Sequence, residues 1–368
     1  MAQAAVDISL DAIRANVAHL VSGTDAAVMA VVKGDGYGHG MLESARAAIS
    51  GGATWLGVCT LDEALDLREG GITAPVLAWL LAPGLPLHLA IEADIDLSAS
   101  SAGLLAEIVG SARAAGRPAR VHLKVDTGLG RGGAATADWP VLAEAAAKAQ
   151  VDGSVEVVGV WSHLARADEP GHESIDRQLG MFGDALDRAH RLGINPTYRH
   201  IANSAAALTR PDTHLDLVRT GIAVYGLSPV PGRDFGLRPA MTVRATVILT
   251  KRVPAGHGVS YGHTYVTERD ATLAVVPLGY ADGVPRAASS AGPVWLAGKT
   301  RRIAGRVCMD QIVVDCGDDE VRAGDEAILF GPGDLGEPTA DDWAAAAGTI
   351  NYEIVTRFHS ARVPRRYV

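Results

Sequence analysis

Chemically useful side chains stand where several short apolar segments of the sequence end. Lys33 follows AVMAVV, and other such ends carry Lys124, His163, Asn203 and Arg219. At the end of a buried segment a lysine ammonium is partly desolvated, which makes the neutral amine available as a nucleophile or base. Pairing with Asp35 would instead make Lys33 an ordinary ion-pair residue. Position alone leaves both roles open.

Several other kinds of chemistry are not expected. Cys59, Cys308 and Cys316 lack C-x-x-C spacing and no H-E-x-x-H motif occurs, so neither a disulfide framework nor a metal site is predicted. The 368 residues carry a net charge of −9, which argues against a nucleic-acid partner. The sequence shows no signal peptide and no apolar run near the ~20 residues of a membrane span. We therefore expect a soluble, cytoplasmic protein.

The apolar segments recur with a regular cadence, each followed by a helix-like stretch. They cover 26–33, 55–59, 75–80, 94–99, 119–126, 155–163, 198–203 and 215–219. Most are continuously apolar, which is typical of strands buried on both faces. Eight such steps favour an α/β fold in which residues 1–231 form a (β/α)8 barrel, although a doubly wound sheet has the same local pattern. In a barrel, the strand ends would bring the polar residues together in one mouth.

The character of the chain changes near residue 230. SPVPGRDFGLRP at 228–239 reads as a linker. Short β-branched runs between 241 and 331 then predict a mainly β C-terminal domain over 232–368, and 341–358 predicts one short helix and a return.

The predicted barrel offers a place for an anion. Barrels often bind phosphate with the loops that follow strands seven and eight. Here those loops contain Ser204, whose hydroxyl can donate, and Gly221 followed by Ile222, where backbone amides can approach an anion closely.

Six segments resemble, in order, motifs of the alanine racemase family. The most specific is AVVKGDGYGHG at 30–40, which is similar to the family's cofactor-attachment signature, although alanine is usual where Gly34 stands. The others are KVDTGLGR at 124–131, VSYG at 259–262, GYADG at 279–283, RVCMD at 306–310 and INYE at 350–353.

This resemblance implies a pyridoxal 5'-phosphate enzyme that interconverts L-alanine and D-alanine and supplies D-alanine for peptidoglycan. Lys33 would carry the cofactor as a Schiff base and act as the base on the D-alanine side. Tyr261, from the partner subunit of a homodimer, would act on the L-alanine side, where positive charge must stabilise its phenolate.

The resemblance also implies the remaining roles. Arg131 and the backbone of Met309 would hold the substrate carboxylate, and Lys124 would be carbamylated or, in the simpler alternative, paired with Asp126. The phosphate would be held by Tyr37, Ser204, Gly221, Ile222 and Tyr352.

Arg219 would meet the pyridine nitrogen and could form one hydrogen-bonded chain with His163 and His200. Because a guanidinium only donates, that nitrogen would stay unprotonated, which weakens the ring as an electron sink and suppresses side reactions.

Three other functions are open. A racemase of broader specificity would differ only in its pocket. A pyridoxal-phosphate-dependent decarboxylase of related fold would carry a Gly-Gly-Gly phosphate run, which this sequence lacks. A non-catalytic pyridoxal-phosphate carrier would resemble the barrel alone, without the segments that bear Tyr261, Met309 and Tyr352.

Overall fold

Two compact units make up the chain in a computed structural model that describes residues 3–368. The barrel unit contains residues 13–36 and 41–237. The β unit contains the residues up to 12, the short segment 37–40 and residues 238–368. The first strand and the residues just after Lys33 therefore cluster with the C-terminal part of the chain.

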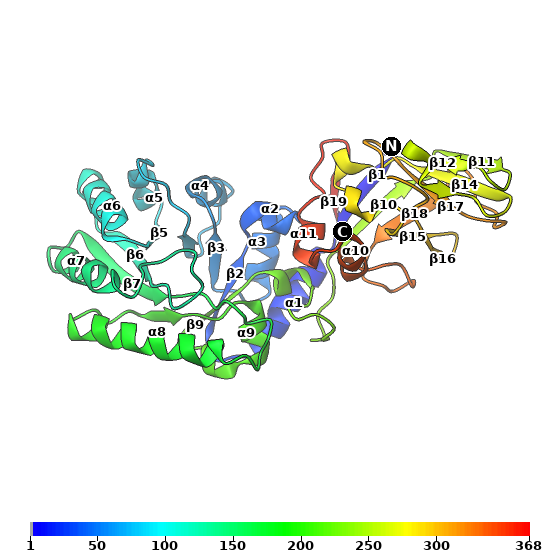
Figure 1. The fold of residues 1–368 in the computed structure, drawn as a ribbon. Coiled ribbons are helices and arrows are strands. Elements are labelled where there is room, and N and C mark those ends of the chain that lie inside the picture. Colours follow the sequence, from blue (N-terminus) through cyan, green and yellow to red (C-terminus); the bar gives the residue numbers. More distant parts are fainter. Residues whose placement is uncertain (1–2) are drawn as a thin grey trace. The chain divides into compact units, whose positions relative to one another are not determined.

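Eight parallel strands form the sheet of the barrel unit (Figure 1). They are β2 (Ala27–Val31), β3 (Trp55–Val58), β4 (Val76–Ala78), β5 (Ile95–Ala99), β6 (Ala119–Lys124), β7 (Val155–Trp161), β8 (Tyr198–His200) and β9 (Leu217–Thr220). From β2 to β8 each strand pairs with the next along the chain, and β9 pairs with β2. Hydrogen bonds from Asp216 N to Arg199 O and from Arg219 N to Ala202 O draw β9 toward the β8 segment, so the ring is nearly closed. The predicted barrel is confirmed, and every strand overlaps a predicted apolar run.

Helices alternate with these strands and cover their outer side (Figure 1). They are α1 (Leu10–Ser22), α3 (Met41–Ser50), α4 (Leu61–Glu69), α5 (Leu87–Glu92), α6 (Ala102–Ala115), α7 (Trp139–Val151), α8 (Ser174–Arg191) and α9 (Ser204–Thr209), with the 3-10 turns η1 (Pro211–Thr213) and η2 (Ile222–Tyr225). The short segment α2 (Lys33–Tyr37) follows β2 and is a left-handed turn rather than a regular helix. Helix α4 shows why the boundaries fall where they do. Thr60 and Glu63 form a capping box at its start, and Gly70 caps its end.

Five barrel strands contribute side chains to one apolar cluster, which packs these strands together. Its buried members are Met29, Trp55, Leu77, Val158 and Leu217. Burying one such side chain stabilises the fold by about 1.5–3 kcal/mol. The strands that carry the polar residues are therefore held rigidly.

The β unit is built on a six-stranded sheet with the order β16-β15-β18-β10-β1-β19. Its strands are β1 (Ala4–Ile8), β10 (Met241–Thr246), β15 (Pro293–Leu296), β16 (Lys299–Arg302), β18 (Glu326–Phe330) and β19 (Arg365–Tyr367). Strand β1 pairs with β10 antiparallel and with β19 parallel, so the first strand of the chain lies inside this sheet.

Smaller elements complete the β unit and confirm that this part of the chain is mainly β. The strands β11 (Leu249–Val253), β14 (Ala271–Val276) and β17 (Ile312–Asp315) form one sheet, and β12 (Gly258–Val259) pairs with β13 (Tyr265–Val266). The 3-10 turns are η3 (Tyr261–His263), η4 (Tyr280–Asp282) and η5 (Arg286–Ala288).

The prediction of one helix near the C-terminus is wrong, because two are present. Gly348 ends α10 (Ala340–Ala347) in a left-handed conformation, and the chain begins α11 (Asn351–Val355) three residues later. Within residues 3–368, no helix combines the length and the apolarity needed to cross a membrane.

Candidate active site

Lys33 opens a left-handed turn directly after β2. Gly34, Asp35 and Gly36 have φ angles of 61°, 53° and 62°. Glycine adopts this conformation at little cost, which explains two of the three residues. The Asp35 carboxylate accepts a hydrogen bond from Met41 N at 2.9 Å, which closes the turn. The Lys33 ammonium lies 5.9 Å from the centroid of the Trp79 ring.

A single carboxylate, that of Glu63, ties this turn to the start of α4. Its Oε1 accepts from Gly34 N at 2.6 Å. Its Oε2 accepts from Cys59 N at 2.8 Å and from Thr60 N at 3.1 Å. The backbone next to Lys33 is therefore held by a side chain from the following strand–helix step.

Arg219 lies buried in the barrel and donates to both histidines that the sequence singles out. The distances are 3.1 Å to His200 Nδ1 and 3.2 Å to His163 Nδ1, so the predicted chain is confirmed. Because guanidinium only donates, each of these nitrogens must accept, and both rings are neutral. Burial, followed by the charge of Arg219, holds the pKa of His163 and of His200 well below the usual range. Trp161 supports the guanidinium, whose central carbon lies 4.7 Å from the ring centroid.

Lys124 shares the Trp161 ring with Arg219, its ammonium lying 4.3 Å from the centroid. Burial first, then the charges of Arg219 and Arg131, lowers the pKa of Lys124 to about 8. Asp126 does not serve mainly as its partner. Its carboxylate accepts the backbone amides of residues 128, 129 and 130 at 2.9, 2.9 and 3.2 Å and so supports the loop that leads to Arg131. Together with Lys33, these residues give the barrel a cationic interior that attracts anions.

The loops after β8 and β9 meet at Ser204. Its hydroxyl oxygen accepts from Gly221 N at 2.8 Å and from Ala223 N at 3.4 Å. With its oxygen already accepting, the hydroxyl hydrogen is available to an anion. Ile222, the first residue of η2, stands between these two amides. The meeting of these loops is as the sequence predicts.

Tyr37 and Tyr352 come together in the β unit, with ring centroids 6.3 Å apart. The segment that begins at Tyr37 packs closely on α11, because a Cβ on Gly38 would lie 2.5 Å from Val355 O. This contact explains why residues 37–40 cluster with the β unit although they lie only four to seven residues after Lys33.

Tyr261 and Met309 are exposed on adjoining loops of the β unit. Their side chains are 69% and 53% exposed. Ser260, with a φ of 62°, donates from its hydroxyl to Arg306 O at 2.7 Å. The same oxygen lies 3.4 Å from Cys308 Sγ. These contacts place the Tyr261 turn against the segment that carries Met309.

The predicted site residues therefore fall into two groups, one in each unit. The barrel group contains Lys33, Lys124, Arg131, His163, Ser204, Arg219, Gly221 and Ile222, and the β group contains Tyr37, Tyr261, Met309 and Tyr352. Sequence reasoning missed the tryptophans that support the cations, Trp79 and Trp161. Their only signal is an aromatic residue at the end of a predicted strand.

A nearly closed barrel with a cationic interior, followed by a β unit, is the architecture of a barrel enzyme of two units whose interior attracts an anionic group. Comparison with known proteins makes this specific. Residues 8–229 match the model "Alanine racemase, N-terminal domain", and residues 240–367 match "Alanine racemase, C-terminal domain".

Individual relatives agree along the whole chain. An alanine racemase of Salinispora arenicola is 70% identical, covering 100% of this chain and 99% of the relative. The crystal structure of alanine racemase from Streptomyces lavendulae superposes with a TM-score of 0.98 at 57% identity, covering 100% and 97% of the two chains. A Clostridium difficile alanine racemase in complex with cycloserine gives 0.88 at 32% identity, covering 100% and 96%. The chain belongs to the alanine racemase family, whose members are isomerases.

Proposed function

We propose that this protein interconverts L-alanine and D-alanine by means of pyridoxal 5'-phosphate bound in the barrel, with Lys33 as its anchor. Membership of the family supports the reaction. The observation that carries the cofactor assignment is the buried, donor-only Arg219, held by two neutral histidines. It matches a ligand that presents a lone pair, such as a pyridine nitrogen.

The donors that are present fit the rest of the cofactor. The Ser204 hydroxyl hydrogen and the Ile222 amide, which stands between the two amides that donate to Ser204, suit a phosphate. We assign Gly221, Tyr37 and Tyr352 to the same group. When bound, the cofactor withdraws electrons from the amino acid and so acidifies its Cα hydrogen. Because its guanidinium only donates, Arg219 would hold the ring nitrogen of the bound cofactor unprotonated, which would weaken this withdrawal.

Two acid–base groups exchange the proton. Lys33 Nζ removes or returns it on one face of the substrate, and the Tyr261 hydroxyl does so on the other. Each group contributes about 10²–10⁴-fold to the rate. Arg131 and the backbone N–H of Met309 hold the substrate carboxylate.

We assign a carbamate to Lys124. Only a neutral amine reacts with carbon dioxide, and a pKa of about 8 leaves a substantial neutral fraction near neutral pH. The modification would turn the buried Lys124 cation into an anion whose charge attracts Arg219 and Arg131, which relieves the repulsion that these arginines now exert on it.

We further propose a homodimer in which Tyr261 serves the partner's barrel. An exposed tyrosine on the β unit is suited to complete the site of another subunit. Apart from residues 3–12 and 37–40, which cluster with the β unit, the domains would divide at residues 1–231 and 232–368, and the D-alanine formed would feed peptidoglycan synthesis. A cytoplasmic location suits the three cysteines, which are all free.

A racemisation assay with alanine, serine and lysine side by side tests this function. Inversion of alanine alone is expected. Inversion of all three would indicate a broad racemase, release of carbon dioxide a decarboxylase, and no turnover an inert carrier. Borohydride reduction followed by peptide mapping should place the pyridoxyl group on Lys33, and labelling of another residue would refute the anchor.

The two-base assignment has its own test in Tyr261→Phe. Racemisation should fall by about 10²–10⁴-fold. Exchange of the α-hydrogen of D-alanine with deuterated water, followed by NMR, should continue because Lys33 is intact. Tyr265→Phe, from the same region but with a hydroxyl that donates to Asp315 at 2.7 Å, is the matched control. Near-normal racemisation by Tyr261→Phe would exclude this tyrosine as a base.

A further inference from the structure

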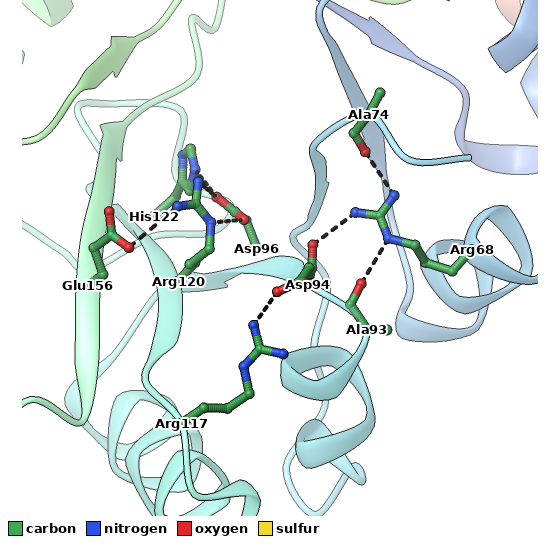
Figure 2. Close-up of polar contacts among 9 residues, drawn as sticks. All are labelled: Arg68, Ala74, Ala93, Asp94, Asp96, Arg117, Arg120, His122 and Glu156. Carbon is green, nitrogen blue, oxygen red and sulfur yellow. Dashed lines mark hydrogen bonds and ion pairs between the residues drawn. The ribbon is translucent and has the colours of Figure 1, made fainter. Parts of the chain in front are cut away.

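A line of buried hydrogen bonds crosses the barrel from Arg219 to a carboxylate on β5. Arg219 donates to His200 Nδ1 at 3.1 Å, and His200 Nε2 lies 2.9 Å from His122 Nδ1. His122 Nε2 lies 3.1 Å from Asp96 Oδ2. All four side chains are buried, and each comes from a different strand. Figure 2 shows the far end of this line, where His122 and Asp96 meet.

The two ends of the line allow only one placement of the ring protons. Arg219 has no acceptor, so His200 Nδ1 must accept and its proton must sit on Nε2. His122 Nδ1 then accepts that proton's hydrogen bond, and its own proton sits on Nε2, facing Asp96. An extra proton on either ring would set a donor against a donor. Every link therefore points from Arg219 to Asp96.

Arg120, a neighbour of Asp96, helps to keep the Asp96 carboxylate ionised. Arg120 donates from Nε to Asp96 Oδ1 at 2.8 Å, and its Nη1 lies 3.4 Å from Glu156 (Figure 2). Burial raises the pKa of Asp96, but the hydrogen bonds from His122 and Arg120 outweigh it, and the pKa lies below the usual range. The line thus runs from a buried cation to a buried anion through two neutral rings.

Residues on neighbouring strands pack closely against the His122 and His200 rings. A Cβ on Gly159 would lie 2.2 Å from His122 Nδ1, so β7 leaves the space that the ring occupies. Trp55 packs edge-on against His122, with ring centroids 5.5 Å apart. Trp161 stacks on His200 at 5.6 Å with an interplanar angle of 4°. Both rings are therefore fixed in orientation as well as in tautomer.

Arg219 needs such a partner. Burial lowers its pKa to about 9, and in the described part of the chain no carboxylate lies within 4.0 Å of the guanidinium. We propose that Asp96 is a positioning residue for racemisation, which acts through His122 and His200 to hold Arg219 charged and correctly oriented at the cofactor ring. The role of Arg219 at the cofactor ring rests on the proposed function, whereas the hydrogen bonds from Arg219 to Asp96 do not.

Ring-nitrogen NMR of the purified protein tests the tautomers directly. His122 and His200 should each carry a single proton, on Nε2. His200 should not titrate between about pH 5.5 and about pH 8.5, because Arg219, His122 and Trp161 are the groups that face it. A proton on Nδ1 of either ring, or titration of His200 in this range, would overturn the proposal.

Asp96→Asn provides the matched perturbation. The carboxamide of asparagine offers one oxygen and one NH2 group. Because Arg120 can only donate, the oxygen should face Arg120, which leaves the NH2 group facing His122 Nε2, so that this nitrogen must accept. At least one ring should leave the Nε2–H tautomer, and kcat should fall about tenfold with KM changed less than about threefold, as for other groups that orient an active-site residue. Asp94→Asn, an exposed neighbour that pairs with Arg117, should change neither the spectra nor the kinetics.

Gly159→Ala covers the case in which Asp96→Asn does not fold. It moves the His122 ring without removing any polar group, and it should disturb the same ring signals and lower kcat while KM stays near normal. Wild-type spectra and kcat in whichever variant folds would refute the proposal. The NMR spectra do not depend on the substrate. An error in the proposed reaction would therefore appear in the racemisation assay alone, whereas an error in the proposed hydrogen-bond directions would appear in the spectra.

Discussion

Three cations of the barrel unit lie against or near aromatic rings. Lys124 and Arg219 both lie against Trp161, and Lys33 lies near Trp79. An aromatic face attracts a cation without neutralising it, so the positive potential stays available to an anionic ligand. The same crowding makes Lys124 the cation that most readily loses its proton, because a guanidinium retains its own.

A carbamate on Lys124 should therefore form in a pH-dependent manner. With a pKa of about 8, roughly one Lys124 in ten is neutral at pH 7 and half near pH 8, whereas an ordinary lysine is almost fully charged. In ¹³C-bicarbonate, a carbamate NMR signal should grow between these pH values. It should vanish in Lys124→Arg and persist in Lys148→Arg, which alters an exposed lysine of the same unit. A signal unaffected by Lys124→Arg would exclude this site.

Glu63 is the residue on which the position of the Lys33 turn depends. In Glu63→Gln the amide nitrogen cannot accept, so the backbone amides of Gly34 or of Cys59 and Thr60 lose their partner. We expect a loss of about 1–2 kcal/mol in the free energy of unfolding and a slower attachment of the cofactor. Urea unfolding and the rise of cofactor absorbance measure the two effects. Asp62→Asn, a neighbour on the same first helical turn, should leave attachment at the wild-type rate.

At the scale of elements, the left-handed turn after β2 is the least common piece of backbone near the site. Gly34→Ala should destabilise the protein by about 1 kcal/mol, because an L-residue at a φ of 61° is strained although no atom lies within 4 Å of its Cβ. Gly110→Ala, in the interior of α6, should instead stabilise by about 0.5–1 kcal/mol. Thermal unfolding of the two variants should shift Tm in opposite directions. Equal shifts would contradict the left-handed assignment.

The elements also show how far sequence reasoning extends. Strand ends such as Lys33 and Arg219 were predictable, because continuous apolar runs locate buried strands and the barrel puts their ends together. Asp96 and His122 were not, since a polar residue inside an apolar run has no motif, and its partners come from strands distant in sequence. The place of β1 in the C-terminal sheet was equally hidden, because pairing between chain ends leaves no local pattern.

At the scale of the whole molecule, one reaction is assigned to residues of two units, with Lys33 in the barrel unit and Tyr261 in the β unit. In a (β/α)8 barrel the catalytic residues usually come from the ends of the barrel's own strands. A second base on a separate unit therefore needs an explanation. The proposed sharing between subunits would explain it, because a symmetric dimer can exchange the same loop in both directions and complete two sites at once.

Mixed dimers test this sharing. Lys33→Ala and Tyr261→Ala subunits should each be inactive alone. Co-expressed, half of the dimers are mixed, and each of these has one barrel with an intact Lys33 facing an intact Tyr261. Activity should therefore return to about one quarter of the wild-type value if sites are shared across a two-fold axis. If both bases came from one subunit, every site would stay defective and no activity would return. Light scattering of the tagged mixture establishes that the mixed dimers formed.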